Sequence, residues 1–170
     1  MLAFLDTAYF DDVLTAKPEY ENAIQLVAVD GSALVGLLDV AVEGEAATIE
    51  TIAVDPSRYR SGVGSALLDE AKTRLPATVR SLDAWTRDDD QANGWYAAKG
   101  FVETLRYLHV YASSPEEAAS AIRSPMHDLT LVKGFFHAPI EAESQLRESF
   151  HRVHICRRYE LALGSEARSA

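Results

Sequence analysis

The sequence predicts an α/β fold in which helices flank a central mixed sheet. Between Ala23 and Val54, three β-rich runs are joined by short turns, which indicates an antiparallel meander. At Gly64 the apolar residues begin to recur at helical spacing. The following order of strand, helix, strand, helix and strand requires a parallel part of the sheet beside the antiparallel part.

The N-terminal half should begin with a helix and continue into the meander. We expect the helix over Ala3–Leu14, followed by a turn at Lys17-Pro18-Glu19. Asp30-Gly31 is a strong hairpin signal, and Glu43-Gly44-Glu45 marks the second turn. The three strands of the meander are expected over Ala23–Val29, Ala33–Val42 and Ala47–Val54.

The second half alternates helices with strands. A helix should run from Gly64 until Pro76 stops it, with Leu67, Leu68, Ala71 and Leu75 on its apolar face. Pro115 and two glutamates then suggest a helix that Ser114 opens, and 124–140 look irregular. The other expected elements are a strand over Arg80–Thr86, a helix over Asp90–Lys99 closed by Gly100, and strands over Phe101–Tyr111 and Arg152–Leu163 that lie side by side.

Composition suits one domain over residues 1–170, of which 48% are hydrophobic and 25% charged. The chain has no run of about 18 apolar residues, so we expect no membrane span, and its N-terminus lacks the pattern of a signal peptide. Cys156 is the only cysteine, which excludes an internal disulfide and fits a cytoplasmic location. The net charge of −10 argues against nucleic acid as a partner and weakly favours a cationic one.

The segment from Val54 to Gly64 has the features of an anion-binding site. A strand ends at Val54, and a helix begins at Gly62-Val63-Gly64. Glycine permits a sharp turn and close approach of a ligand, while the first amides of the helix have no partner inside it. These amides and the helix dipole favour phosphate, although an ordinary tight turn would show the same glycines. The chain has neither the Walker pattern nor the three-glycine dinucleotide fingerprint.

Two motifs in this order resemble those of GNAT acetyltransferases. The coenzyme A loop of that family fits here at Val54, Pro56, Gly62 and Gly64. A second family pattern follows about 30 residues later and matches at Ala92, Trp95, Tyr96, Gly100 and Phe101. The resemblance covers Ala23–Tyr111 and implies a GNAT-like fold. The family's first strand looks missing or replaced, and residues 113–150 look like an elaboration.

The sequence departs from the family pattern at two positions. Tyr59 stands where the family has Arg or Gln, so Arg60 is our substitute for the side chain that contacts the pyrophosphate. Asp89 replaces an Asn that the family places near the pantetheine arm. The backbone donors of the turn depend on the glycines and should survive both changes.

The resemblance implies an N-acetyltransferase that moves an acetyl group from acetyl-CoA to a primary amine of a small molecule or peptide. Direct attack in a ternary complex is the implied mechanism, and a homodimer is one possible assembly. A non-catalytic acyl-CoA-binding module is the alternative. The residues expected to bind the cofactor are Ile52, Ala53, Val54, Arg60, Ser61, Gly62, Val63, Gly64, Ser65, Asp89 and Tyr96.

Tyr96 and Glu50 are the candidate catalytic residues. By the resemblance, Tyr96 lies near the departing sulfur, and a phenol can protonate a thiolate; the alternative is a packing role on a helix face. Glu50 is the candidate base, on one strand face with Thr48 and Ile52, or else it is an exposed charge.

The remaining candidates are less specific. His109 would be a base, a substrate contact or a packed histidine, and Trp85 and Arg87 could shape the acceptor pocket. Asp39 and Asp83 either face the site or bond to neighbours. We expect no metal site, because His151, His154 and Cys156 fit one face of neither a helix nor a strand and lack a fourth ligand.

Overall fold

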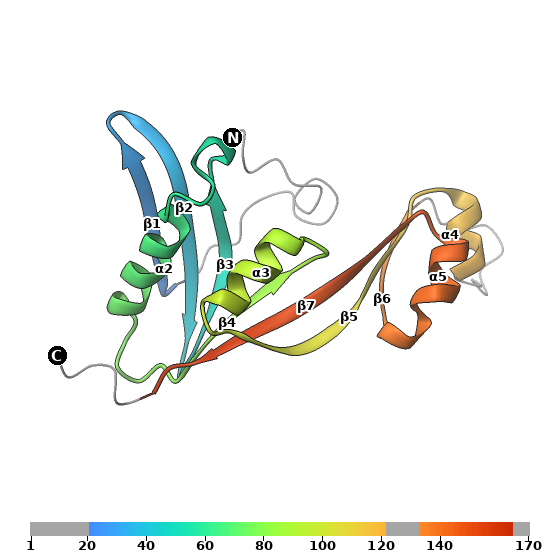
Figure 1. Ribbon diagram of the computed structural model, residues 1–170. Coiled ribbons are helices and arrows are strands. Elements are labelled where there is room, and N and C mark those ends of the chain that lie inside the picture. The colour runs from blue at the N-terminus through green and yellow to red at the C-terminus, as the bar shows by residue number, and fades with distance from the viewer. Residues whose placement is uncertain (1–20, 122–132, 165–170) are drawn as a thin grey trace. The chain divides into compact units, whose positions relative to one another are not determined.

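The computed structural model describes residues 21–121 and 133–164. They form two compact units, one of 21–84 with 161–164 and one of 85–121 with 133–160 (Figure 1). The helix expected over 3–14 and the turn at 17–19 lie outside the described residues. One domain over residues 1–170 stays a prediction.

The first unit contains the meander and the parallel strand that follows it. Its strands are β1 (Ala23–Asp30), β2 (Ala33–Glu43), β3 (Ala46–Val54) and the start of β4 (Ser81–Thr86), in that order across the sheet. β1 with β2 and β2 with β3 pair antiparallel, whereas residues 46–49 of β3 pair in parallel with residues 81–84 of β4. Gly31 and Gly44 make the two hairpin turns with φ of 62° and 61°. The predicted mixed sheet is confirmed.

Register shifts add one residue to β2 and one to β3. Val35 is extra in the pairing of β1 with β2, and Glu50 is extra in the pairing of β2 with β3. A bulge of this kind interrupts the alternation of side chains along a strand. The expectation that Thr48, Glu50 and Ile52 share one face is therefore wrong, because Glu50 is the inserted residue.

Helix α2 (Val63–Arg74) packs on β1, β2 and β3 and buries Leu67, Leu68 and Ala71. These are the positions that the helical spacing predicted. A short 3-10 helix, η2 (Pro56–Arg58), precedes α2 in the connection from β3. Gly36 of β2 lies under the first turn, where an added Cβ would come within 2.8 Å of Val63 Cγ1.

In the second unit, β5 (Val102–Ala112) pairs antiparallel with β7 (Arg152–Ala162) and with β6 (Gly134–Ala138). The predicted neighbours 101–111 and 152–163 are thus confirmed. The prediction that 124–140 are irregular is wrong for residues 134–138, which form β6. The helical segments of this unit are α3 (Asp90–Ala98), α4 (Pro115–Ala121), η3 (Ile140–Ala142) and α5 (Glu143–Ser149).

One face of β5, β6 and β7 carries the core of the second unit. Leu108, Val110 and Ala112 alternate along β5 and pack with Ala118 of α4 and Phe150. The alternate residues of these strands therefore form a second, chemically different face. Among residues 21–121 and 133–164, no helix combines the length and the apolar character needed to cross a bilayer.

Candidate functional site

The phosphate turn, residues 55–65, leaves the end of β3 through a capped 3-10 turn. The Asp55 backbone N–H donates to the Val35 carbonyl over 2.9 Å. The Asp55 carboxylate accepts from the Ser57 N–H at 2.8 Å and from the Ser57 hydroxyl at 2.7 Å. The Ser57 hydroxyl and then its amide hold the pKa of Asp55 below the ordinary value. This cap fixes the direction in which the chain leaves the sheet.

Side-chain contacts hold the middle of the turn. Arg58 reaches back to Asp30 at the end of β1, with 2.5 Å between Nη2 and Oδ2. The Ser61 hydroxyl donates to the Arg58 carbonyl at 2.6 Å, and the Ser61 amide donates to the same oxygen at 3.3 Å. The predicted ligand contact of Ser61 would therefore compete with bonds inside the turn.

Gly62 gives α2 an uncapped N-terminus. Its φ of 89° is in the left-handed region, and no side chain caps the helix. The first helical bond runs from the Ala66 N–H to the Gly62 carbonyl at 2.9 Å. The amides of Val63, Gly64 and Ser65 thus have no acceptor within the helix. A Cβ built on Gly62 meets nothing within 4 Å.

Arg60 is the cation of the turn that makes no contact within the described part of the chain. It is exposed, and among residues 21–121 and 133–164 its guanidinium has neither a hydrogen bond nor an ion pair. Its φ of 62° makes it the one non-glycine residue of these ranges in the left-handed region, a conformation that costs about 1–2 kcal/mol. Arg60 therefore suits the pyrophosphate role predicted for it.

The three β3 residues expected to offer backbone contacts end this strand. Ile52, Ala53 and Val54 pair with residues 36–38 of β2 and are half-buried. They lie beyond the stretch of β3 that pairs with residues 81–84 of β4. Glu50, the inserted residue, is exposed. Asp39 pairs opposite Thr51, and Asp83, which is buried, pairs opposite Thr48.

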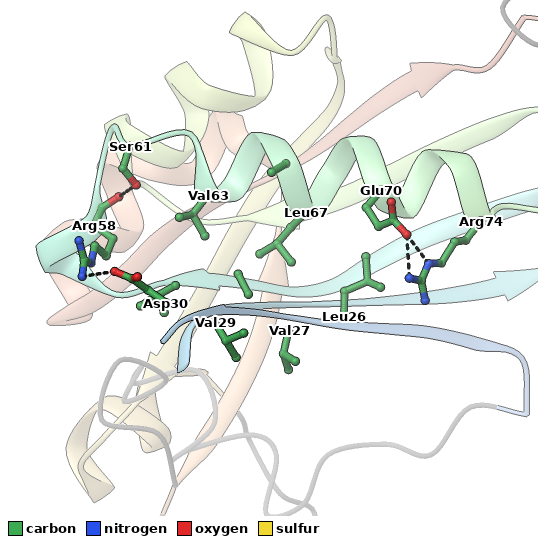
Figure 2. Close-up of a pocket in the computed structure, with 13 residues that line it drawn as sticks. Leu26, Val27, Val29, Asp30, Arg58, Ser61, Val63, Leu67, Glu70 and Arg74 are labelled. Atoms are coloured by element: carbon green, nitrogen blue, oxygen red, sulfur yellow. Dashed lines mark hydrogen bonds and ion pairs between the residues drawn. The ribbon is translucent and has the colours of Figure 1, made fainter. Parts of the chain in front are cut away.

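A groove of about 510 Å³ lies between α2 and β1 (Figure 2). Its lining includes the apolar side chains of Leu26, Val35 and Leu67. One end is flanked by the Arg58–Asp30 pair, and the other by Arg74 and Glu70 at 2.7 Å. Among the residues expected to bind the cofactor, only Ser61 and Val63 line this groove.

In the second unit, Tyr96 is held by a stack of rings. Its ring is stacked on Tyr159 at 5.4 Å and meets Trp95 and Phe101 edge-on at 5.0 Å and 5.3 Å. Burial raises the pKa of the phenol far above its ordinary value, so the hydroxyl stays protonated at any physiological pH. No hydrogen bond to this hydroxyl occurs within the described residues.

Asp89 is the N-cap of α3. Its carboxylate accepts from the amides of Gln91 and Ala92 at 2.9 Å and 3.1 Å. Such a cap starts the helix and fixes the orientation of Tyr96 along it. The contact to the pantetheine arm that was predicted for Asp89 stays a prediction, and any such contact must share the carboxylate with these amides.

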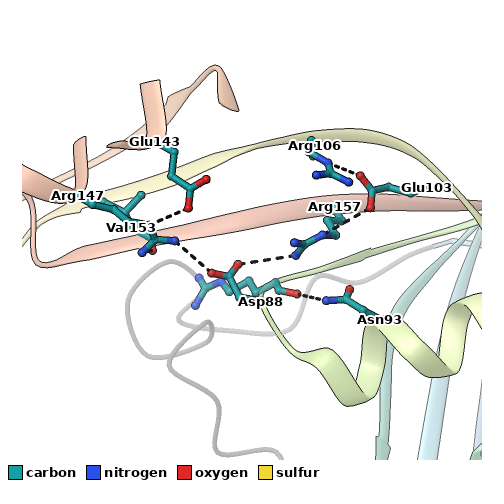
Figure 3. Close-up of polar contacts among 9 residues, drawn as sticks. Asp88, Asn93, Glu103, Arg106, Glu143, Arg147, Val153 and Arg157 are labelled. Atoms are coloured by element: carbon teal, nitrogen blue, oxygen red, sulfur yellow. Dashed lines mark hydrogen bonds and ion pairs between the residues drawn. The ribbon is translucent and has the colours of Figure 1, made fainter. Parts of the chain in front are cut away.

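An ionic network anchors the loop before α3 (Figure 3). Asp88 lies 3.6 Å from Arg147 of α5 and 4.0 Å from Arg157 of β7. Arg157 also lies 3.6 Å from Glu103, and Glu103 contacts Arg106 at 2.5 Å. The network ties the start of α3 to β5, β7 and α5, so it positions the helix that carries Tyr96.

Asn93 is a residue that the sequence motifs did not single out. Its amide donates to the Arg87 carbonyl at 3.3 Å, and its Oδ1 is buried without a hydrogen-bond partner among the described residues. A buried amide oxygen usually has a donor, so Asn93 suits a ligand with an N–H group. The one sign of such a role in the sequence is the position of Asn93, one helical turn before Tyr96.

The other predicted residues of this unit lie on the strands. Trp85 packs edge-on to Tyr107 at 5.8 Å, and His109 is buried. His151 donates from its backbone to the Glu117 carboxylate at 2.8 Å, and its Nδ1 lies 2.7 Å from the same oxygen. Cys156 is buried, and burial raises the pKa of its thiol.

Comparisons with known proteins find one family match and several similar folds. The family model of the acetyltransferase (GNAT) domain matches residues 21–103. The ribosomal-protein-S18-alanine N-acetyltransferase of Escherichia coli has a similar fold, with a TM-score of 0.53 and 18% identity over 89% of this chain and 77% of that one. An acetyltransferase of Bacillus cereus has a TM-score of 0.53 and 16% identity over 84% and 74%.

A candidate streptothricin acetyltransferase of Bacillus anthracis, solved with acetyl coenzyme A, has a TM-score of 0.55 and 16% identity. That match covers 84% of this chain and 64% of the other. No curated protein matches the sequence. The family model thus covers just under half of the chain, and the solved structures share the fold of the chain.

Proposed function

We propose that this protein is an N-acetyltransferase whose phosphate turn holds the pyrophosphate of acetyl-CoA. The observation that carries the proposal is the N-terminus of α2, where Gly62 adopts φ of 89° and no side chain caps the first-turn amides. Amides without partners at a helix N-terminus attract phosphate. Arg60, exposed at the same turn, supplies the side-chain cation.

The reaction we propose is direct attack of a primary amine on the thioester. The amine nitrogen bonds to the carbonyl carbon while its proton passes to a base, and the carbonyl oxygen takes up negative charge. Collapse then breaks the C–S bond, and the departing thiolate receives a proton. The backbone N–H near Val54 would stabilise the oxyanion. The acceptor is a small molecule or a peptide.

Tyr96 is proposed as the acid that protonates the thiolate. Burial keeps the Tyr96 hydroxyl protonated, so it can donate a hydrogen bond to the thiolate, but the raised pKa also makes it a weaker acid. The ring of Tyr159 stacked on it holds the phenol in one orientation. Glu50 is proposed as the base that accepts the amine proton, directly or through water. Its exposure and its place at the bulge suit a proton that is released to solvent.

A non-catalytic acyl-CoA-binding module is the second candidate. Two observations favour it: Tyr59 stands at the family's Arg or Gln position, and Asp89 uses its carboxylate as a helix cap. Both candidates require the phosphate turn, and only the enzyme requires the Tyr96 hydroxyl. The cytoplasmic location and a homodimer stay predictions.

Removing a single hydroxyl separates these candidates. Tyr96→Phe keeps the ring and its stack on Tyr159 but removes the donor, so the release of coenzyme A thiol in the presence of amines should fall about 100-fold. Acetyl-CoA binding should persist. Tyr159→Phe is the matched control, since it removes the hydroxyl of the stacked partner. Equal rates for the wild type and both variants would contradict the acid role of Tyr96.

A further inference from the structure

One sheet face of the second unit gathers rings and cations. We call this the aromatic face. It is opposite the face that carries the apolar core. Its members alternate along their strands: Tyr107, His109 and Tyr111 on β5, Phe135 and His137 on β6, and Arg152 and His154 on β7. Arg87, which follows β4, joins them through a hydrogen bond from its guanidinium to the Tyr111 hydroxyl.

The rings of the aromatic face pack against each other in a fixed arrangement. His109 and His137 are stacked, with 5.0 Å between centroids and 10° between planes. Phe135 meets His137 edge-on at 5.2 Å, and the Tyr107 hydroxyl lies 3.0 Å from His109 Nε2. An aromatic or apolar group could stack here without loss of side-chain freedom, because the rings are already ordered.

Two guanidinium groups stand beside Tyr111. The Arg152 guanidinium carbon is 4.2 Å from the centre of the ring, and that of Arg87 is 5.4 Å away. Burial and then the charge of Arg87 lower the pKa of both His109 and His154, that of His109 to about 4. The imidazoles of these two residues are therefore neutral at pH 7.

The aromatic face is open to solvent at several points. Phe135 is 39% exposed, Trp85 beside Tyr107 is 42% exposed, and His137 is exposed. Arg87 and Arg152 are each half-buried beside the rings, and Arg87 Nε and Arg152 Nη2 are themselves buried. Rings with adjoining guanidinium groups favour a molecule that has both an apolar body and a carboxylate.

We propose that the aromatic face binds the acceptor, and that the acceptor is an amine that also carries a carboxylate. Arg87 and Arg152 hold the carboxylate, and the rings of Phe135 and His137 take the apolar body. The transfer of acetyl to this amine rests on the function proposed above, whereas carboxylate binding does not. The net charge of −10 favoured a cationic acceptor, but this face carries two guanidinium groups.

Matched small molecules test the proposal. L-phenylalanine and 3-phenylpropionate carry the carboxylate, and L-phenylalaninamide and phenethylamine do not. Each is titrated into the wild-type protein while the Cε1–H signals of the histidines are followed by NMR. We expect the carboxylates to shift the signals of His109 and His137, and the other two probes to bind at least tenfold more weakly.

Variants assign the effect to the guanidinium groups. Arg152→Gln and Arg87→Gln should each weaken carboxylate binding about tenfold or more, Arg152→Lys should restore part of it, and Arg106→Gln, at an exposed ion pair with Glu103, should leave it unchanged. An unaltered far-UV circular dichroism spectrum and Tm without ligand show that a variant is folded.

Equal binding of the amide and the acid, or no carboxylate effect at 10 mM (about a hundred times a typical 0.1 mM Kd), would overturn the proposal. Acetyl-CoA titration of the same variants keeps the two proposals apart. If the arginine variants lose carboxylate binding but retain acetyl-CoA binding, the acceptor site is supported. If the wild type does not bind acetyl-CoA, the proposed acetyltransferase function is refuted, while the proposal of carboxylate binding still stands.

Discussion

Gly36 of β2 lies beneath the first turn of α2, so alanine at this position should disturb the phosphate turn from below. An added Cβ would lie 2.8 Å from Val63 Cγ1, 3.1 Å from Leu67 Cδ1 and 3.3 Å from the Ala53 carbonyl oxygen. Carbon atoms at rest are about 3.5–4.0 Å apart. Val63 is β-branched and stiff, so α2 itself must move.

The magnitude follows from these distances. Overpacking of this kind costs about 1–3 kcal/mol, which for a chain of this length is roughly 3–9 °C in Tm. Because Val63 is the first residue of α2, the movement also displaces the amides proposed to bind pyrophosphate. We therefore expect Gly36→Ala to weaken acetyl-CoA binding about tenfold, in addition to lowering Tm.

Calorimetric unfolding and isothermal titration with acetyl-CoA measure both effects. Gly94→Ala is the control: Gly94 lies inside α3, its added Cβ meets nothing within 4 Å, and helix propensity predicts a gain of about 0.5–1 kcal/mol. If Gly36→Ala binds acetyl-CoA as the wild type does and melts no earlier, the link between β2 packing and the phosphate turn is refuted.

Three further predictions concern the scaffold. Leu68→Ala, at a fully buried position of α2, should lower the free energy of unfolding by about 2–5 kcal/mol in urea titrations, and a loss below 1 kcal/mol would contradict its core role. Hydrogen bonds from His151 lower the pKa of Glu117 from 4.5 to about 2. The ionised Glu117 carboxylate thus stabilises the fold above pH 4.5, and this stabilisation is lost as the pH falls towards 2. In Glu117→Gln, this part of the pH dependence should be absent from acid-unfolding curves. Cys156 should react with iodoacetamide far more slowly in the native protein than in urea, because its thiol is buried and its pKa is raised.

The sequence predicted those elements whose signals are local. Gly31 and Gly44 marked the turns of the meander, and the spacing of Leu67, Leu68 and Ala71 marked α2. The phosphate turn could be predicted because Gly62 adopts a positive φ, and a glycine in the sequence marks such a position. Local signals therefore predicted the strands and the helix of the first unit and the backbone geometry of the phosphate turn.

What the sequence did not reveal depends on contacts between distant segments. β6 was missed because Phe135 and His137 face one side while Phe136 packs on the core at the other, so the run shows no alternation of polar and apolar residues. The bulge at Glu50 has no sequence signal, and it overturned the predicted shared face. The aromatic face is assembled by strand pairing, which places His109 opposite both His137 and His154.

The most direct measurement is a thermal-shift titration with acetyl-CoA on the wild type, Gly62→Trp and Gly44→Trp. Both glycines have a positive φ and open space around an added Cβ, so the two substitutions strain the backbone alike. Only Gly62 adjoins the first-turn amides. At 100 times the Kd, acetyl-CoA should add about 2.7 kcal/mol, or roughly 5–10 °C, to the wild type and to Gly44→Trp. The shift should vanish in Gly62→Trp; no shift in the wild type at millimolar acetyl-CoA, or an equal shift in all three, would contradict binding at the phosphate turn.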